Sequence, residues 1–214
     1  MKKADIISKT LNQMFPHAKV ELRYANTFEL LVAVVLSAQT TDIAVNRVTP
    51  ELFQKYPTPY DLKQASLTAV ENMIRSIGLY RHKAKHIVEL ARVIDEVYGG
   101  VVPQEREKLE RLPGVGRKTT NVVLSNAFQI PAFAVDTHVA RISVRLGLAH
   151  ESDSVLEIEH QLMKHFPESE WLRLHHQMIF FGRYHCLAKQ PKCYKCPLFD
   201  QCVSDIKWTY QKAD

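Results

Sequence analysis

The chain has 214 residues, 46% of them hydrophobic and 24% charged, with a formal net charge of +5 and an isoelectric point of about 9.0. This composition is that of a folded globular protein and excludes a disordered or fibrous one. The basic balance alone is only a weak indication of a polyanionic partner, because many basic proteins bind no nucleic acid.

The first predicted helix lies near the N-terminus, where Ile7, Leu11 and Met14 share one face and polar residues interrupt any apolar signal core. We therefore expect the protein to stay in the cytoplasm. The apolar run from Leu30 to Leu36 is much shorter than the roughly 20 residues that cross a bilayer. It predicts a helix buried inside the protein and no association with a membrane.

Helical patterns continue along the rest of the chain, which predicts an all-α fold. Pro50 is expected to break the helix that starts at Asp42. Gly99 and Gly100 are a stop signal. The chain has no recognisable linker, so a second domain would pack closely against the first. Further helix starts are predicted at Asn26, Ser66, Ser154 and Ser169.

The segment KLERLPGVGRKTTNVVLSNAF, residues 108–128, predicts two helices joined by a tight turn. Pro113 ends the first helix, and the second is expected from Thr119 to Phe128. Gly114 and Gly116 can adopt positive φ and let the backbone approach another molecule closely. Their N–H groups and the next helix N-terminus would form an anion site, a helix-hairpin-helix for a DNA phosphate. A plain glycine turn between packed helices is the alternative.

The basic pair Arg117 and Lys118, directly after the glycines, favours the phosphate site over that alternative. Residues 111–145 contain five arginines and lysines but a single acid, Asp136. Asp136 has two interpretations that do not exclude each other. It can cap the helix that begins at Thr137, and it can act as a catalytic carboxylate in a basic region.

All four cysteines lie near the C-terminus, as Cys186-x6-Cys193-x2-Cys196-x5-Cys202. A cytosolic chain keeps its thiols reduced, which favours a metal centre over disulfides. One C-x2-C pair with two longer arms suits an iron–sulfur cluster better than zinc, although zinc stays open. A zinc deaminase fits poorly, since its signature places proline directly before C-x2-C.

The lysines of this segment indicate how the loop is used. Lys189, Lys192 and Lys195 fall among the cysteines and give the loop a charged face suited to a phosphate contact, whereas an electron carrier would present an apolar docking face. Lys189 and Lys192 are the predicted DNA contacts.

Together with the cysteine loop, four motifs resemble the endonuclease III family of DNA glycosylases over nearly the whole chain: LSAQTTD at 36–42, IGLYRHKA at 77–84, LPGVGRKT at 112–119 and VDTHVAR at 135–141. The resemblance implies a two-domain helix-hairpin-helix DNA glycosylase fold. A six-helix domain would span residues 20–130. Residues 1–19 and 131–214 would form a second helical domain with a C-terminal [4Fe-4S] cluster loop. It also implies a monomer.

By the same resemblance, Lys118 is the attacking amine and Asp136 its partner. The enzyme would remove oxidised pyrimidines from double-stranded DNA and cleave the abasic site through a Schiff base. Gln39 and Leu79 would enter the DNA as wedges, with His138 beside them. The residues alone leave open that Leu79 is a core leucine and Gln39 a helix cap.

Position 118 separates the competing activities. Related adenine glycosylases resemble this pattern with serine there, and thymine mismatch glycosylases with tyrosine, so a lysine favours a combined glycosylase and lyase. A non-catalytic DNA-binding or redox protein is the alternative from another class.

Overall fold

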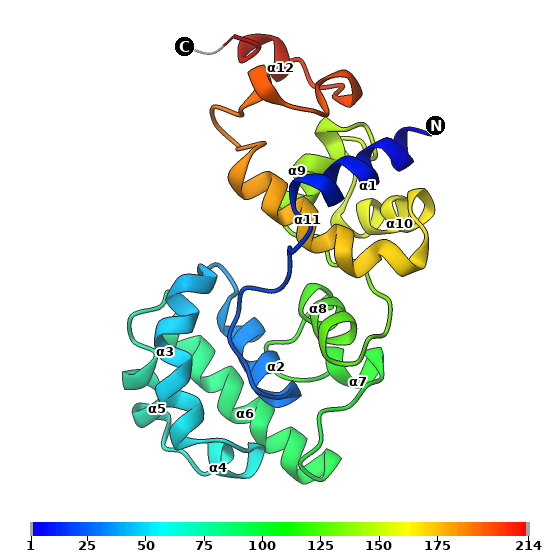
Figure 1. Ribbon diagram of the computed structural model, residues 1–214. Coiled ribbons are helices and arrows are strands. Elements are labelled where there is room, and N and C mark those ends of the chain that lie inside the picture. The colour runs from blue at the N-terminus through cyan, green and yellow to red at the C-terminus, as the bar shows by residue number, and fades with distance from the viewer. Residues whose placement is uncertain (1, 213–214) are drawn as a thin grey trace. The chain divides into compact units, whose positions relative to one another are not determined.

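The computed structural model describes residues 2–212, and within them the chain forms α-helices and short 3-10 helices and no β-strand (Figure 1). The all-α prediction is confirmed. The chain divides into two compact units. The middle unit runs from Glu21 to Ile130, and the terminal unit combines the chain up to Val20 with the chain from Pro131 onward. No helix in residues 2–212 has both the length and the apolar composition needed to cross a membrane.

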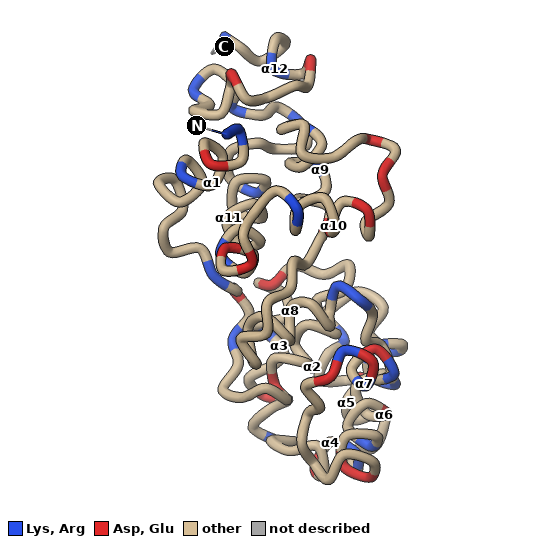
Figure 2. The backbone as a smooth tube through the Cα atoms, turned by 90° about the vertical axis from the view of Figure 1, so that its right-hand side faces the viewer, with Lys and Arg blue, Asp and Glu red and all other residues tan. Residues whose placement is uncertain are grey.

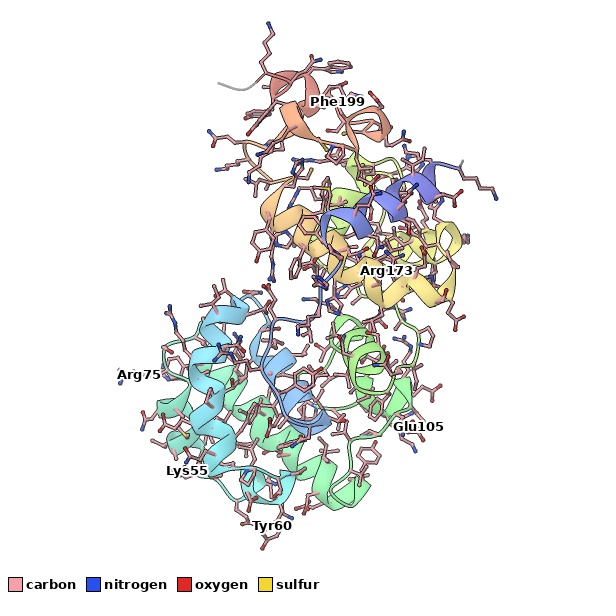
Figure 3. The ribbon with its side chains drawn as sticks, viewed as in Figure 1. Lys55, Tyr60, Arg75, Glu105, Arg173 and Phe199 are labelled. Carbon is pink, nitrogen blue, oxygen red and sulfur yellow. The ribbon has the colours of Figure 1, made fainter. Side chains whose placement is uncertain are left out.

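The middle unit is built around α2, whose residues from Leu30 to Leu36 are almost completely buried. This helix packs against α3, α6 and α8, and α6 also packs against α4 and α5 (Figure 1). Lys55, Tyr60 and Arg75 project away from this core (Figure 3). The helices are α2 (Thr27–Leu36), α3 (Asp42–Lys55), α4 (Pro59–Lys63), α5 (Leu67–Met73), α6 (Tyr80–Tyr98), α7 (Arg106–Glu110) and α8 (Arg117–Ala127).

The terminal unit joins the first helix of the chain to the last ones around a second apolar core, which includes Ile7, Phe133 and Phe181. Helix α11 contacts both α1 and α9, and α9 also contacts α10. The elements are α1 (Lys3–Met14), α9 (Thr137–Arg145), α10 (Val155–His165), η1 (Glu168–Glu170), α11 (Trp171–Tyr184), η2 (Cys193–Lys195), η3 (Phe199–Gln201) and α12 (Ile206–Thr209).

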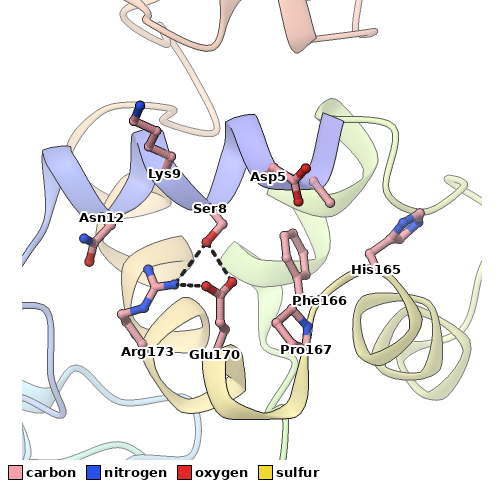
Figure 4. A pocket seen from close by; sticks show the side chains of 10 residues that line it. Asp5, Ser8, Lys9, Asn12, His165, Phe166, Pro167, Glu170 and Arg173 are labelled. Atoms are coloured by element: carbon pink, nitrogen blue, oxygen red, sulfur yellow. Dashed lines mark hydrogen bonds and ion pairs between the residues drawn. The ribbon is translucent and has the colours of Figure 1, made fainter. Parts of the chain in front are cut away.

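A pocket of the terminal unit shows how α1 is held in place (Figure 4). Ser8 Oγ donates to Glu170 Oε2 at 2.7 Å, and Arg173 donates to Ser8 Oγ at 3.0 Å. Arg173 also pairs with Glu170 Oε1 at 2.8 Å. Gln177 extends the network to Asn12 Oδ1 at 3.1 Å. These polar groups satisfy one another across the contact between α1 and α11, so they dock the N-terminal helix.

Most of the predicted helix boundaries are found, because they depend on local capping. Asn26 and Ser66 accept backbone N–H groups at their helix starts, and Ser154 forms the predicted capping box with Glu157. Gly99 ends α6 with φ 62°, as its stop signal predicts.

The prediction that Pro50 ends its helix is wrong, because α3 continues through it to Lys55. Pro50 lies on the exposed side of α3, while Val48 and Leu52 on either side of it are buried. Packing of this face outweighs the single lost hydrogen bond.

The predicted start at Ser169 is also wrong. Ser169 lies within the 3-10 turn η1, and α11 follows at Trp171 without a side-chain cap. The Trp171 indole, which donates to the Phe166 carbonyl at 2.9 Å, fixes the start of the helix instead.

Candidate active site

The predicted hairpin lies in the middle unit, between α7 and α8. Gly114 has φ +76°, whereas Gly116 has φ −109° and ψ −178°, which is extended backbone that any residue adopts. Positive φ is therefore confirmed for Gly114 and wrong for Gly116. A Cβ on Gly114 would lie 3.0 Å from His86 Cβ, while a Cβ on Gly116 would meet nothing within 4 Å. Gly114 lets the turn pack on α6, and Gly116 leaves an open face.

Lys118 is exposed in the first turn of α8. The helix begins at Arg117, two residues earlier than predicted, because Gly116 acts as the N-cap and its carbonyl accepts from Thr120 N at 2.9 Å. No acidic residue lies in this first turn. The N–H groups and partial positive charge of a helix N-terminus attract phosphate. This environment suits a phosphate contact, and the exposed Lys118 amine is accessible to a substrate.

One side-chain hydrogen bond ties α7 to α8. Arg106 of α7 donates to Asn121 Oδ1 of α8 at 2.7 Å, while its ion pair with Glu110 at 3.2 Å lies within α7. The two helices of the hairpin are thereby held together independently of any ligand.

Two other turns of the middle unit present the expected wedge residues. Gln39 follows α2 with φ 53°, and Leu79 precedes α6 with φ 58°. Left-handed backbone at a non-glycine residue costs on the order of 1–3 kcal/mol. Gln39 is exposed, and Leu79 is 56% exposed. The interpretation of Leu79 as a core leucine is wrong, and so is that of Gln39 as a cap, because Ser37 caps α2.

Asp136 lies at the start of α9 in the terminal unit and caps it as predicted. Its Oδ1 accepts from His138 N at 2.9 Å and from Val139 N at 2.8 Å. Among residues 2–212, Oδ2 has no hydrogen-bond donor. One oxygen therefore orients the carboxylate, and the other keeps its capacity to act on a substrate.

His138 is half-buried beside Asp136, where burial lowers the pKa of its imidazole and the Asp136 charge opposes that change. A Cβ on Gly182 would lie 3.0 Å from His138 Cβ, so the glycine lets α11 approach α9 closely. The packing of α11 thereby fixes where the His138 ring lies.

Arg141 and Arg145, two arginines of the basic region, donate hydrogen bonds to other groups within the terminal unit. Arg141 donates to the Gly182 carbonyl at 2.9 Å and to the Cys186 carbonyl at 3.2 Å. Arg145 donates to Cys186 Sγ at 3.2 Å and to the Leu187 carbonyl at 2.7 Å. Lys and Arg are interspersed with acids over both units (Figure 2). The basic charge offered to a partner is therefore smaller than the sequence indicates.

The four cysteines line one cavity of the terminal unit, together with apolar side chains and two cations, Arg145 and Lys207. Burial raises the pKa of the Cys186 and Cys193 thiols, and raises the pKa of Cys196 to about 11. Thiolates here need a compensating positive charge, which metal binding supplies. In residues 2–212, no three His, Cys, Asp or Glu side chains form a single-ion metal site.

Two of the three lysines in the cysteine loop, Lys189 and Lys192, are predicted to contact DNA, and they differ in their surroundings. Lys189 is exposed, whereas Lys192 is half-buried and donates to the Tyr184 carbonyl at 2.8 Å, at the end of α11. Lys192 therefore stabilises the loop whether or not it also contacts a ligand.

Residues 32–168 match the HhH-GPD superfamily of base excision DNA repair proteins. The chain is 54% identical to endonuclease III of Bacillus subtilis (strain 168) over 94% of this chain and 92% of the relative. Two solved structures cover 99% of this chain and 100% of their own, each with a TM-score of 0.93. They are a trapped endonuclease III–DNA covalent intermediate, 51% identical, and a non-covalent endonuclease III–DNA complex, 52% identical.

The fold and these similarities define a helix-hairpin-helix base excision repair enzyme, a DNA glycosylase and abasic-site lyase. The structural agreement extends over both units rather than over the hairpin alone. The chain belongs to the endonuclease III family.

Proposed function

We propose that this protein excises oxidised pyrimidines from double-stranded DNA and then cleaves the abasic strand by β-elimination. The observation that carries the proposal is Lys118, an exposed amine in the first turn of α8, directly after the open Gly116. Related solved structures that contain DNA, one of them covalently trapped, support a covalent route.

In this mechanism the uncharged amine of Lys118 attacks C1′ of the damaged nucleotide, and the base leaves with the electrons of the glycosidic bond. The attached nitrogen then loses a proton, and its lone pair opens the sugar ring by breaking the C1′–O4′ bond, while O4′ takes up a proton. The resulting Schiff base acidifies the C2′ proton. Loss of that proton expels the 3′ phosphate, and water then releases the enzyme. Asp136 stabilises the positive charge that develops on the sugar and shuttles a proton through Oδ2, while Oδ1 stays bound to α9.

The DNA contacts follow from the exposed elements. Gly116 and Arg117 hold a phosphate at the N-terminus of α8, and Gly114 shapes the turn. Gln39 and Leu79 fill the space that the everted nucleotide leaves, since a base must be turned out of the stack before an amine can reach C1′. His138, Lys189 and Lys192 add contacts from the terminal unit, Lys192 through the two N–H donors that Tyr184 does not use.

The cysteines Cys186, Cys193, Cys196 and Cys202 bind one [4Fe-4S] cluster, which supplies a rigid cross-link of the loop when bound. The apolar cavity that all four line supports this assignment, and Arg145 and Lys207 offset the negative charge of four thiolates. We infer that the protein acts as a monomer in the cytoplasm, on chromosomal DNA.

Borohydride trapping on duplex DNA with an oxidised pyrimidine tests the catalytic assignment. Wild-type protein should become covalently attached to the DNA, and Lys118→Gln should give no adduct and no strand cleavage. Arg117→Gln is the matched control, because it removes one charge from the same helix turn. It should bind more weakly yet still be trapped. Trapping of Lys118→Gln at the wild-type level would show that another amine is the nucleophile.

A further inference from the structure

Lys83 connects the two turns that present Gln39 and Leu79. Its backbone N–H donates to the Leu79 carbonyl at 3.0 Å, and its side-chain Nζ donates to Thr40 Oγ1 at 2.6 Å. Thr40 directly follows Gln39 in the turn between α2 and α3. A single residue of α6 is therefore bonded to both exposed left-handed turns, although these lie 40 positions apart in the chain.

The position is unusual for a lysine. Lys83 is only 4% exposed, on the face of α6 that also buries Ile87 and Leu90. Burial lowers the pKa of its ammonium group. Among residues 2–212 it forms no ion pair, and the Thr40 hydroxyl is its one hydrogen-bond acceptor. Helix packing does not need an amine here, because an apolar side chain would fill the same space without the desolvation.

The turns themselves need an external support. Gln39 and Leu79 both have left-handed backbone, which persists at such residues only where surrounding contacts determine it. Leu79 has no side-chain capping bond at the start of α6. The buried contact from Lys83 to Thr40 supplies a support of this kind for both turns at once.

We propose that Lys83 is a positioning residue that holds the Gln39 and Leu79 turns in register, so that both side chains enter the DNA together. This inference rests on the proposed wedge role of those two residues. Lys83 is buried and its side chain is bonded to Thr40, so this role requires no contact with the substrate. Its effect should therefore appear only where a duplex has to be opened.

Single-turnover excision of an oxidised pyrimidine from duplex DNA is compared with strand cleavage at a single-stranded abasic site. Lys83→Met and Thr40→Val should each slow duplex excision by about tenfold and change single-stranded cleavage by less than about twofold. Thr40→Ser keeps the acceptor oxygen and should retain the wild-type rate. Lys85→Met is the matched control, because Lys85 is an exposed lysine two residues along the same helix.

The decisive variant adds Lys83→Met to a protein that already carries Gln39→Ala and Leu79→Ala. Without wedges to position, Lys83→Met should cause no further loss on duplex DNA. A further tenfold loss in that background would overturn the proposal, as would wild-type excision by both Lys83→Met and Thr40→Val.

The variants Gln39→Ala and Leu79→Ala distinguish failure of the positioning role of Lys83 from failure of the proposed wedge role. Equal losses on duplex and single-stranded DNA for Gln39→Ala and Leu79→Ala would overturn the wedge role and the positioning role together. A duplex-specific loss for these two variants with none for Lys83→Met would overturn the positioning role alone.

Discussion

Alanine substitutions at the two hairpin glycines should separate folding from DNA binding. At Gly114, an alanine would have to keep φ near +76°, which costs about 1–2 kcal/mol for an L-residue. Its Cβ would also lie 3.0 Å from His86 Cβ, so α6 or the turn must shift. The combined loss is about 2 kcal/mol, or a fall in Tm of about 4–8 °C for a chain of this length.

Gly116→Ala should behave in the opposite way. Its backbone is extended and a Cβ meets nothing within 4 Å, so alanine introduces no strain. Alanine is a poorer N-cap than glycine, but it also restricts the unfolded chain, and the two effects nearly cancel. We expect a Tm within about 2 °C of wild type. The methyl group would nevertheless occupy the open face where a phosphate approaches, weakening DNA binding by about tenfold, or about 1.4 kcal/mol.

Thermal unfolding and fluorescence anisotropy on a duplex with a non-cleavable abasic analogue, at one fixed salt concentration, measure the two effects separately. Gly99→Ala is the control, since Gly99 also has positive φ but lies at the far end of α6, away from the hairpin. It should lower Tm without changing affinity. Wild-type affinity in Gly116→Ala would refute the phosphate site and leave the hairpin as a plain glycine turn.

Three further predictions concern the terminal unit. Burial and the neighbouring His175 lower the pKa of His176 to about 3, so the unfolded chain binds a proton there more readily and stability falls as pH drops below about 6.5. His176→Phe should remove up to about 1.4 kcal/mol per pH unit of that loss between pH 6 and 4 in urea titrations, and exposed His17→Gln should not. Arg173→Ala should weaken the packing of α1 against α11 and lower Tm by a few degrees, because it breaks contacts to Ser8 and Glu170. Anaerobically purified protein should be brown with four irons per chain, and stoichiometric zinc without iron would contradict the cluster assignment.

Helix starts that depend on local capping could be predicted from the sequence, and the elements that depend on packing could not. Ser154 and Glu157 are three residues apart, so their reciprocal bonds are visible in the sequence. The continuation of α3 through Pro50 depends on burial of its other face, which no local pattern reveals.

The same distinction applies to the candidate site. The chemistry of Lys118 and Asp136 is indicated by motifs, whereas the partners of Arg141 and Arg145 lie about 40 residues along the chain. The sequence alone therefore suggests that both arginines are available to bind a partner, although their guanidinium groups are already hydrogen-bonded within the protein. The sequence does carry one signal for Lys83, which is a lysine at an apolar position of α6, four residues before Ile87.

Two non-glycine residues with positive φ, Gln129 and Leu79, differ in whether a nearby hydrogen bond explains that conformation. Gln129 follows the C-cap of α8, and its side chain donates to the Asn126 carbonyl at 3.2 Å, so helix termination accounts for its positive φ. Leu79 stands at the start of a helix, where this conformation serves no capping bond, and it exposes an apolar side chain to solvent. Neither propensity nor burial favours that arrangement. The backbone that holds it is bonded to Lys83, itself a costly buried cation. The left-handed, exposed Leu79 and the buried Lys83 are each unfavourable for stability, and such features are expected where a surface is used to bind a partner. A leucine held in this way suits insertion into a base stack.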